Sequence, residues 1–92
     1  MIIRRVVGNS MLPYLKPGNI VLVKKVKKYK IGDIVIANVN NRQVIKRVKN
    51  INNNLYELIG DNKNESTDSR SFGMVQGTDI KGVVFKSYNF FK

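Results

Sequence analysis

Two residues in this sequence have side chains that can act together as a nucleophile and a base. Ser10 lies in the segment GNSMLP (residues 8–13), directly after an apolar stretch. Lys46 lies in the segment QVIKRVK, where side chains that alternate along a strand put it on one face with Val44 and Val48. On an inward face this lysine is partly desolvated, which lowers its pKa from the usual value of about 10.4. A neutral amine is a competent general base for a serine hydroxyl.

Each of these residues, taken alone, also has an ordinary explanation. Ser10 fits a common serine turn, in which the hydroxyl only bonds to nearby backbone. Lys46 fits a lysine that extends its ammonium group into water from the edge of a strand. Considered separately, these ordinary explanations are favoured for both residues.

A third segment, residues 60–73 (GDNKNESTDSRSFG), is the longest polar stretch of the chain. Asp68 and Arg70 are two residues apart, so in an extended segment they face the same side and can form a bidentate ion pair. Loops of this length in small domains are often functional. The alternative is a solvated surface loop.

The elements that must position these residues are predicted to be strands, because apolar residues recur with a period near two. Six segments rich in valine and isoleucine show this pattern: residues 2–7, 20–25, 33–39, 43–49, 54–59 and 80–86. Turn-forming residues separate them, and Asn40-Asn41 and residues 52–54 suit tight hairpins. No segment shows a helical period. The sequence therefore predicts one all-β domain over residues 1–92, a small coiled antiparallel sheet or barrel-like fold.

The composition excludes several kinds of site. The chain has 92 residues, which suits one small domain, and it has no cysteine and no histidine. Disulfides, thiolate or histidine metal sites and Ser-His-Asp catalysis are therefore excluded. We expect no metal and no cofactor.

The net charge of +11 lies entirely in the first half of the chain. Residues 1–50 have 12 lysines and arginines against one acidic residue, whereas residues 51–92 have five of each charge. The densest part, Lys24–Lys30, suits contact with an anionic membrane or a nucleic acid, or it is a solvated basic loop. No segment resembles a transmembrane helix or a signal peptide, so we expect a cytoplasmic or peripheral membrane protein.

The order of four motifs, SMLP, GDIVIA, IKRV and GDNKNESTDSRSFG, resembles the bacterial-type type I signal peptidases, which are Ser-Lys serine proteases. The resemblance runs from about Val7 to Val84. It implies that Ser10 is the nucleophile, that Lys46 is the general base, and that Ser66 orients the lysine amine.

The same resemblance assigns supporting roles. It implies that Asp68 and Arg70 form a structural salt bridge, and that Asn9, Met11 and Pro13 shape the substrate and oxyanion region. The oxyanion donor would be the backbone N–H of Ser10, because Gly8 stands where some relatives have a serine. Asp33, in the GDIV motif, would be structural. A peptide substrate would bind as an added strand, with small side chains before the cut.

Two departures point to a short branch of that family, which includes maturation proteases of nickel-type superoxide dismutase. Nine residues precede Ser10, where an anchor usually stands, and 13 residues separate Lys46 from Gly60, where larger relatives insert a second domain. We therefore predict a minimal serine endopeptidase that trims a leader or signal-like peptide. Peripheral contact with an anionic membrane would use Lys24–Lys30 and the aromatic tail YNFF (residues 88–91).

Two other functions are weighed against this one. A self-cleaving repressor-type domain has the same dyad and β-fold, but the sequence shows no room for a cleavable linker or a DNA-binding module. A non-enzymatic basic module would stack bases on aromatic side chains, yet Tyr14, Tyr29, Tyr56 and Phe72 are scattered and match no nucleic-acid motif. No nucleic-acid partner is expected.

Overall fold

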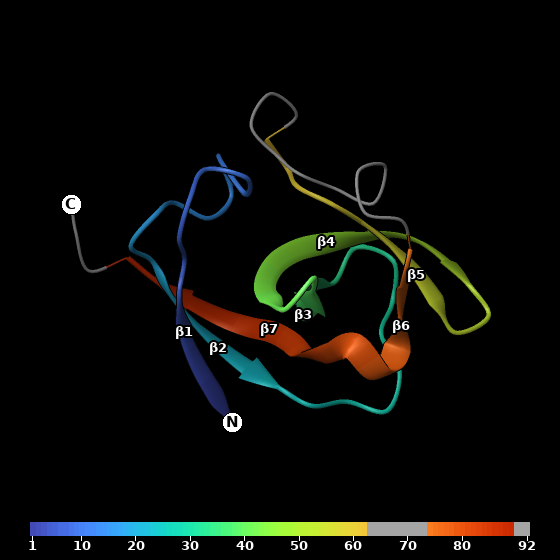
Figure 1. Ribbon diagram of the computed structural model, residues 1–92. Helices are drawn as coiled ribbons and strands as arrows, with labels where there is room; N and C mark the ends of the chain where they lie inside the picture. Colours follow the sequence, from blue (N-terminus) through green and yellow to red (C-terminus); the bar gives the residue numbers. More distant parts are fainter. Residues whose placement is uncertain (63–73, 90–92) are drawn as a thin grey trace.

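The computed structural model describes residues 1–62 and 74–89, and these residues form one antiparallel sheet (Figure 1). The strands are β1 (Ile2–Arg5), β2 (Ile20–Lys24), β3 (Ile34–Val39), β4 (Arg42–Asn52), β5 (Leu55–Ile59), β6 (Val75–Gln76) and β7 (Ile80–Tyr88). Their order across the sheet is β1-β2-β7-β3-β4-β5-β6. The six predicted strands are confirmed. β6 was missed because two residues are too few to show an alternating pattern.

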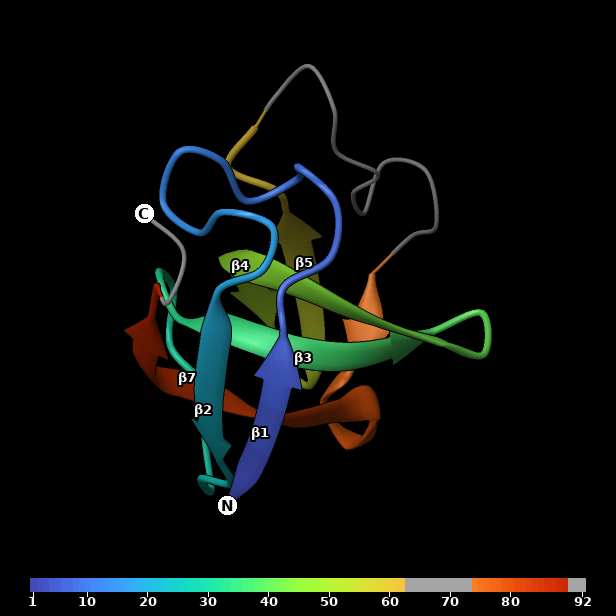
Figure 2. The same ribbon diagram turned by 90° about the vertical axis from the view of Figure 1, so that its left-hand side faces the viewer.

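The sheet is strongly coiled but is not closed into a barrel, because β1 and β6 remain as its two edges. Figure 2 shows β1 and β2 crossing in front of β3 and β4. The register shifts between β2 and β7, between β3 and β7, and between β4 and β5. Such irregularities bend a strand and increase its twist, so they allow one sheet to curl over itself.

Two apolar clusters form the core, one on each face of β3. The first cluster contains Val6, Met11, Leu15, Val21, Val23, Ile34 and Ile36. The second contains Val35, Ala37, Val48, Tyr56, Leu58, Val75 and Ile80. Successive residues of β3 enter different clusters, so the strand is buried on both faces. This explains the continuous apolar run at its start.

The hairpin turns follow the asparagine residues. Asn40 and Asn41 have φ angles of 51° and 65° and join β3 to β4, with Val39 paired to Arg42. Asn53, with φ at 57°, makes the turn between β4 and β5. Asparagine tolerates this left-handed conformation better than most residues. The predicted tight hairpins at both places are confirmed.

The only helical segment in the described residues is a single 3₁₀ turn, Gly77–Asp79, between β6 and β7. In the part of the chain that the structure describes, no helix has the length and apolar character needed to cross a membrane.

Candidate active site

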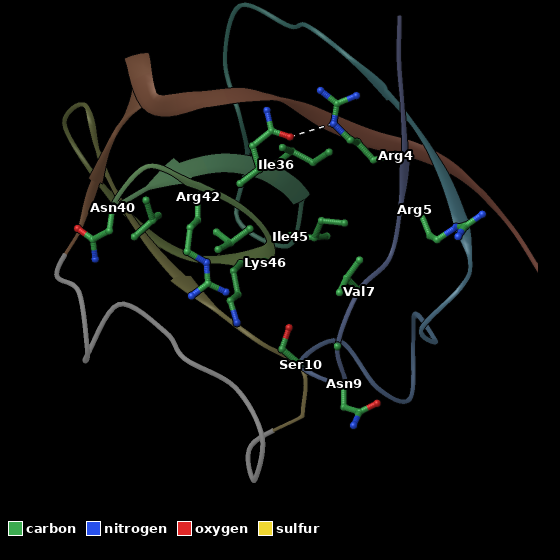
Figure 3. A pocket seen from close by; sticks show the side chains of 14 residues that line it. Arg4, Arg5, Val7, Asn9, Ser10, Ile36, Asn40, Arg42, Ile45 and Lys46 are labelled. Carbon is green, nitrogen blue, oxygen red and sulfur yellow. Dashed lines mark hydrogen bonds between the residues drawn. The ribbon is translucent and has the colours of Figure 1, made fainter.

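A cleft of about 600 Å³ lies between the end of β1, the loop that follows it, and the hairpin of β3 and β4. Ser10 lines it from the loop, and Lys46 lines it from β4. These two residues are 36 positions apart in the sequence, and the curl of the sheet brings them to one cavity. Figure 3 shows both side chains pointing into the cleft, with the Lys46 amine on the side where the Ser10 hydroxyl lies.

Lys46 is held within the sheet and is almost entirely buried, with 4% of its surface exposed. It pairs with Val35 of β3, and Val48 on its own face is buried as well. Of the two alternatives left open by the sequence, the structure shows the buried lysine and not one that extends into water: Val48 beside it is buried, while Val44 is half-buried and lines the cleft.

The chain before Ser10 makes a turn that depends on glycine. Val6 is buried, and its N–H donates to the Asn19 carbonyl at 2.8 Å. Gly8 then has a φ angle of +79°, and a Cβ added there would meet no atom within 4 Å. Glycine is needed at this position for its backbone conformation and not for lack of space. This turn leads the chain from β1 to Ser10 at the cleft.

The chain after Ser10 is anchored in the core. The N–H of Leu15 donates to the Met11 carbonyl at 2.9 Å, and both side chains are buried in the first apolar cluster. Ser10 is therefore held between a glycine turn on one side and a buried anchor on the other.

Asn62 joins this loop to the segment after β5. Its backbone N–H donates to the Ser10 carbonyl at 2.8 Å, and its side-chain Nδ2 donates to the Asn9 carbonyl at 3.0 Å. The two bonds fix the peptide groups on either side of Ser10, which are Asn9–Ser10 and Ser10–Met11. The loop thus depends on a residue more than 50 positions later in the sequence.

An ion pair connects Asn62 to the strand of Lys46. Arg47 donates from Nε and Nη2 to the two carboxylate oxygens of Asp61, each at 2.8 Å, and from Nη1 to the Gly32 carbonyl at 2.9 Å. The hydrogen bonds to Asp61 raise the pKa of Arg47. The guanidinium also lies over the ring of Tyr14, 5.1 Å from its centre. Arg47, Asp61 and Asn62 therefore link the residue after Lys46 to the backbone of Ser10.

The comparison with known families agrees with this arrangement. The sequence pattern of the family described as peptidase S24-like matches residues 1–85. The chain belongs to this family. S24-like proteins include Ser-Lys peptidases and self-cleaving repressors. No curated protein matches the chain. The predicted resemblance is thus confirmed at the level of the Ser-Lys peptidase-like superfamily, and the narrower signal peptidase branch stays a prediction.

The other predicted site residues of the S24-like domain lie in different places. Asn9 lines the cleft, whereas Met11 is in the core beneath the loop and Pro13 is exposed. Asp33 forms a turn, accepting the Lys30 N–H at 2.8 Å, in agreement with its predicted structural role. Ser66, Asp68 and Arg70 lie outside the described residues.

Sequence reasoning missed the ion pair between Arg47 and Asp61. Both residues stood inside quoted motifs, Arg47 in IKRV and Asp61 in GDN, but the only ion pair predicted was that of Asp68 and Arg70, which lie outside the described residues. One signal was available in the sequence. A cation, Arg47, directly follows the candidate base, and an acid, Asp61, stands at the start of the polar segment, so the two could have been expected to pair. The partners are 14 residues apart, so the pair depends on how β4 and β5 are registered.

Proposed function

We propose that the protein is a serine endopeptidase with a dyad of Ser10 and Lys46. The observation that supports this most directly is that a buried lysine and a half-buried serine line one cleft in a member of the S24-like family. Burial favours the neutral amine, which is the form that accepts a proton.

The reaction would proceed through an acyl-enzyme. The Lys46 amine takes the Ser10 hydroxyl proton while the Ser10 oxygen attacks the carbonyl carbon of a peptide bond. The resulting ammonium gives its proton to the leaving amine, and the C–N bond breaks. The Lys46 amine then takes a proton from water, whose oxygen attacks the ester carbonyl carbon. The C–O bond to Ser10 breaks, and the Lys46 ammonium returns the proton to the Ser10 oxygen, which restores both groups. We expect the Ser10 backbone N–H to stabilise the oxyanion in both steps.

The substrate would bind as an extended strand beside β1. β1 is an edge of the sheet, so one side of its backbone is not paired within the sheet. Arg4, Arg5 and the residues that follow β1 line the cleft, so a strand added at this edge would lead toward Ser10. We infer that the segment cleaved is a leader or signal-like peptide with small residues before the scissile bond, as the resemblance to signal peptidases implies.

Self-cleavage, as in a repressor-type Ser-Lys domain, is the second candidate. The S24-like match favours it, because that family includes self-cleaving repressors. In this case the bound strand would belong to the same polypeptide, and the rate would not depend on protein concentration.

A contact with an anionic membrane is proposed for the basic segment between β2 and β3. Tyr29 in this segment packs edge-on against Tyr56 with ring centres 6.0 Å apart, while Lys27 and Lys28 are exposed. The aromatic tail that was expected to share this role ends in Phe90 and Phe91, which lie outside the described residues.

The test uses a set of internally quenched peptides with alanine or glycine before the expected cut. We expect wild-type protein to cleave at least one of them and Ser10→Ala to cleave none, with circular dichroism showing the same β content. Intact mass, followed over time at two protein concentrations, detects self-cleavage. Equal turnover in Ser10→Ala and wild type would refute the dyad in both candidate functions.

A further inference from the structure

Three arginines line the cleft that contains Ser10 and Lys46. Arg4 and Arg5 come from β1, and Arg42 comes from the start of β4, so positive charge lies on both sides of the cavity (Figure 3). In residues 1–62 and 74–89, no aspartate or glutamate lines the cleft. A strand added at β1 would therefore run along a cleft that is lined by arginines and by no described acidic residue.

Arg4 and Arg42 differ in how they are held. Arg4 donates from Nε to Gln43 Oε1 at 2.9 Å and from Nη1 to the Ile3 carbonyl at 2.9 Å, so it bridges β1 to β4. The exposed Arg42 side chain has no hydrogen bond or ion pair with any residue that the structure describes. In Figure 3 it points toward the end of the cleft that holds Lys46 and Ser10.

We propose that the cleft selects peptides with an aspartate or glutamate near the scissile bond, and that Arg42 is the main residue that binds this carboxylate. This inference rests on the proposed peptidase function, because it names the class of substrate for the same cleft. A guanidinium group binds a carboxylate through two parallel hydrogen bonds, which gives direction as well as charge complementarity. Arg5 and Arg4 add a positive potential that favours the same peptides.

The spacing along β4 limits where the acidic residue lies. Arg42 and Lys46 are four residues apart in one strand, which corresponds to about 13 Å between their backbones. The Arg42 side chain covers part of this distance because it points back toward Lys46. A carboxylate about two to four residues from the scissile bond is therefore within its reach.

A peptide fits the cleft better than a nucleic acid does. The backbone edge of β1 borders the same cavity and offers strand pairing, which a peptide uses and a nucleic acid does not. The candidate nucleophile Ser10 also lines this cavity. Binding of an oligonucleotide is the competing outcome in the test below.

The experiment measures binding separately from cleavage. Labelled peptides are titrated with Ser10→Ala protein, and binding is followed by fluorescence anisotropy. The peptides differ only in the residue two to four positions from the cut, which is glutamate, glutamine or lysine. We expect the glutamate peptide to bind about tenfold more tightly than the lysine peptide, as is typical for a hydrogen-bonded charge pair.

Two matched variants separate Arg42 from the overall charge of the protein. Arg42→Glu and Lys49→Glu change the net charge equally and lie on the same strand, but Lys49 is exposed and does not line the cleft. We expect Arg42→Glu to reverse the preference toward the lysine peptide and Lys49→Glu to keep the wild-type preference. If Arg42→Glu is unfolded by circular dichroism, Arg42→Gln is used, and we expect it to remove the preference.

Every result decides between the proposals. Equal binding of the three peptides, or equal effects of the Arg42 and Lys49 variants, would overturn the inference even if wild-type protein cleaves peptides. A glutamate preference that depends on Arg42, without cleavage by the protein with Ser10 intact, would support the inference and contradict the proposed catalysis. A short single-stranded oligonucleotide that binds through Arg42 more tightly than the glutamate peptide would overturn the assignment to a peptide.

Discussion

The strand that carries Lys46 and the loop that carries Ser10 are stabilised in different ways. Lys46 lies on β4, which is paired on both sides, to β3 and to β5, with Val35 and Val48 buried around it. The loop of Ser10 is held by the Gly8 turn, by two hydrogen bonds from Asn62 and by the buried side chains of Met11 and Leu15. Strand pairing on both sides thus determines the surroundings of Lys46, whereas one backbone angle, two hydrogen bonds and an apolar anchor determine the position of Ser10.

This difference suggests that substitutions on the two sides have different consequences. On the β4 side, a change of side-chain chemistry alters reactivity while the strand stays in place. On the loop side, a change far from Ser10 in the sequence alters the position of the hydroxyl while the chemistry of both groups is unchanged. The predictions below test this contrast.

The largest effect is expected for removal of the Lys46 amine. Lys46→Met has a similar length and no charge, so it fits the buried site, and turnover should fall by about 10²–10⁴-fold or more because the general base is lost. Lys46→Arg should lose turnover as well, since guanidinium stays protonated. Peptide cleavage and thermal melting are measured on both variants. A Lys46→Arg protein with wild-type turnover would refute the lysine-base mechanism.

The pH profile of cleavage is the second prediction. If neutral Lys46 is the base, the active fraction of the protein increases as the ammonium loses its proton. kcat/KM should therefore increase by about tenfold per pH unit toward alkaline pH and then become constant. The profile is measured with an uncharged peptide, so that substrate titration does not contribute. A rate that falls from neutral to alkaline pH, while the protein remains folded, would contradict this mechanism.

The local features of this molecule were predictable from sequence, and its distant contacts were not. The alternation around Lys46 and the asparagine turns concern neighbouring residues, and the strands β3, β4 and β5 follow from them. The bond between Arg4 and Gln43 joins residues 39 positions apart, and it forms only because the sheet curls. A period of two reveals which face a side chain takes, but it does not reveal the twist or the bulges that bring two faces together.

The site shows the same division. Val44 and Val48 made burial of Lys46 one of two alternatives, but the support that Asn62 gives to the Ser10 loop has no local signal at all. β6 was missed for a similar reason, because Val75 and Gln76 become a strand only through pairing with Tyr56 and Leu55 of β5.

Loss of the Arg47 ion pair is the third prediction, with an intermediate effect. The side chains of Arg47 and Asp61 are 29% and 17% exposed, so their ion pair is intermediate between a surface ion pair and a fully buried one. Asp61→Asn should therefore lower the free energy of unfolding by about 1–2 kcal/mol. For a domain of this size, each kcal/mol shifts Tm by about 4–8 °C. Turnover should fall as well, because the neighbouring Asn62 holds the Ser10 backbone.

The control for this prediction is Asp79→Asn, which removes the same charge. Asp79 lies in the 3₁₀ turn and forms no ion pair with another described residue. We expect its Tm and turnover to stay close to wild type. If both variants lose stability equally, the ion pair has no special role in holding the loop.

The smallest effect on turnover is expected for Gly8, two residues before the candidate nucleophile. Gly8→Ala places an L-residue at a φ angle of +79°, which costs about 1–2 kcal/mol. Asn53→Ala is the control, because Asn53 also has a positive φ angle, 57°, and lies exposed in the turn between β4 and β5, away from the cleft. Strain alone therefore lowers Tm by a similar amount in both variants. At Gly8 the backbone can relieve the strain by changing its direction, and this backbone leads to Ser10. We therefore expect only Gly8→Ala to lower kcat/KM as well. Equal loss of kcat/KM in the two variants would show that turnover follows global stability, and that the Gly8 turn does not position the hydroxyl.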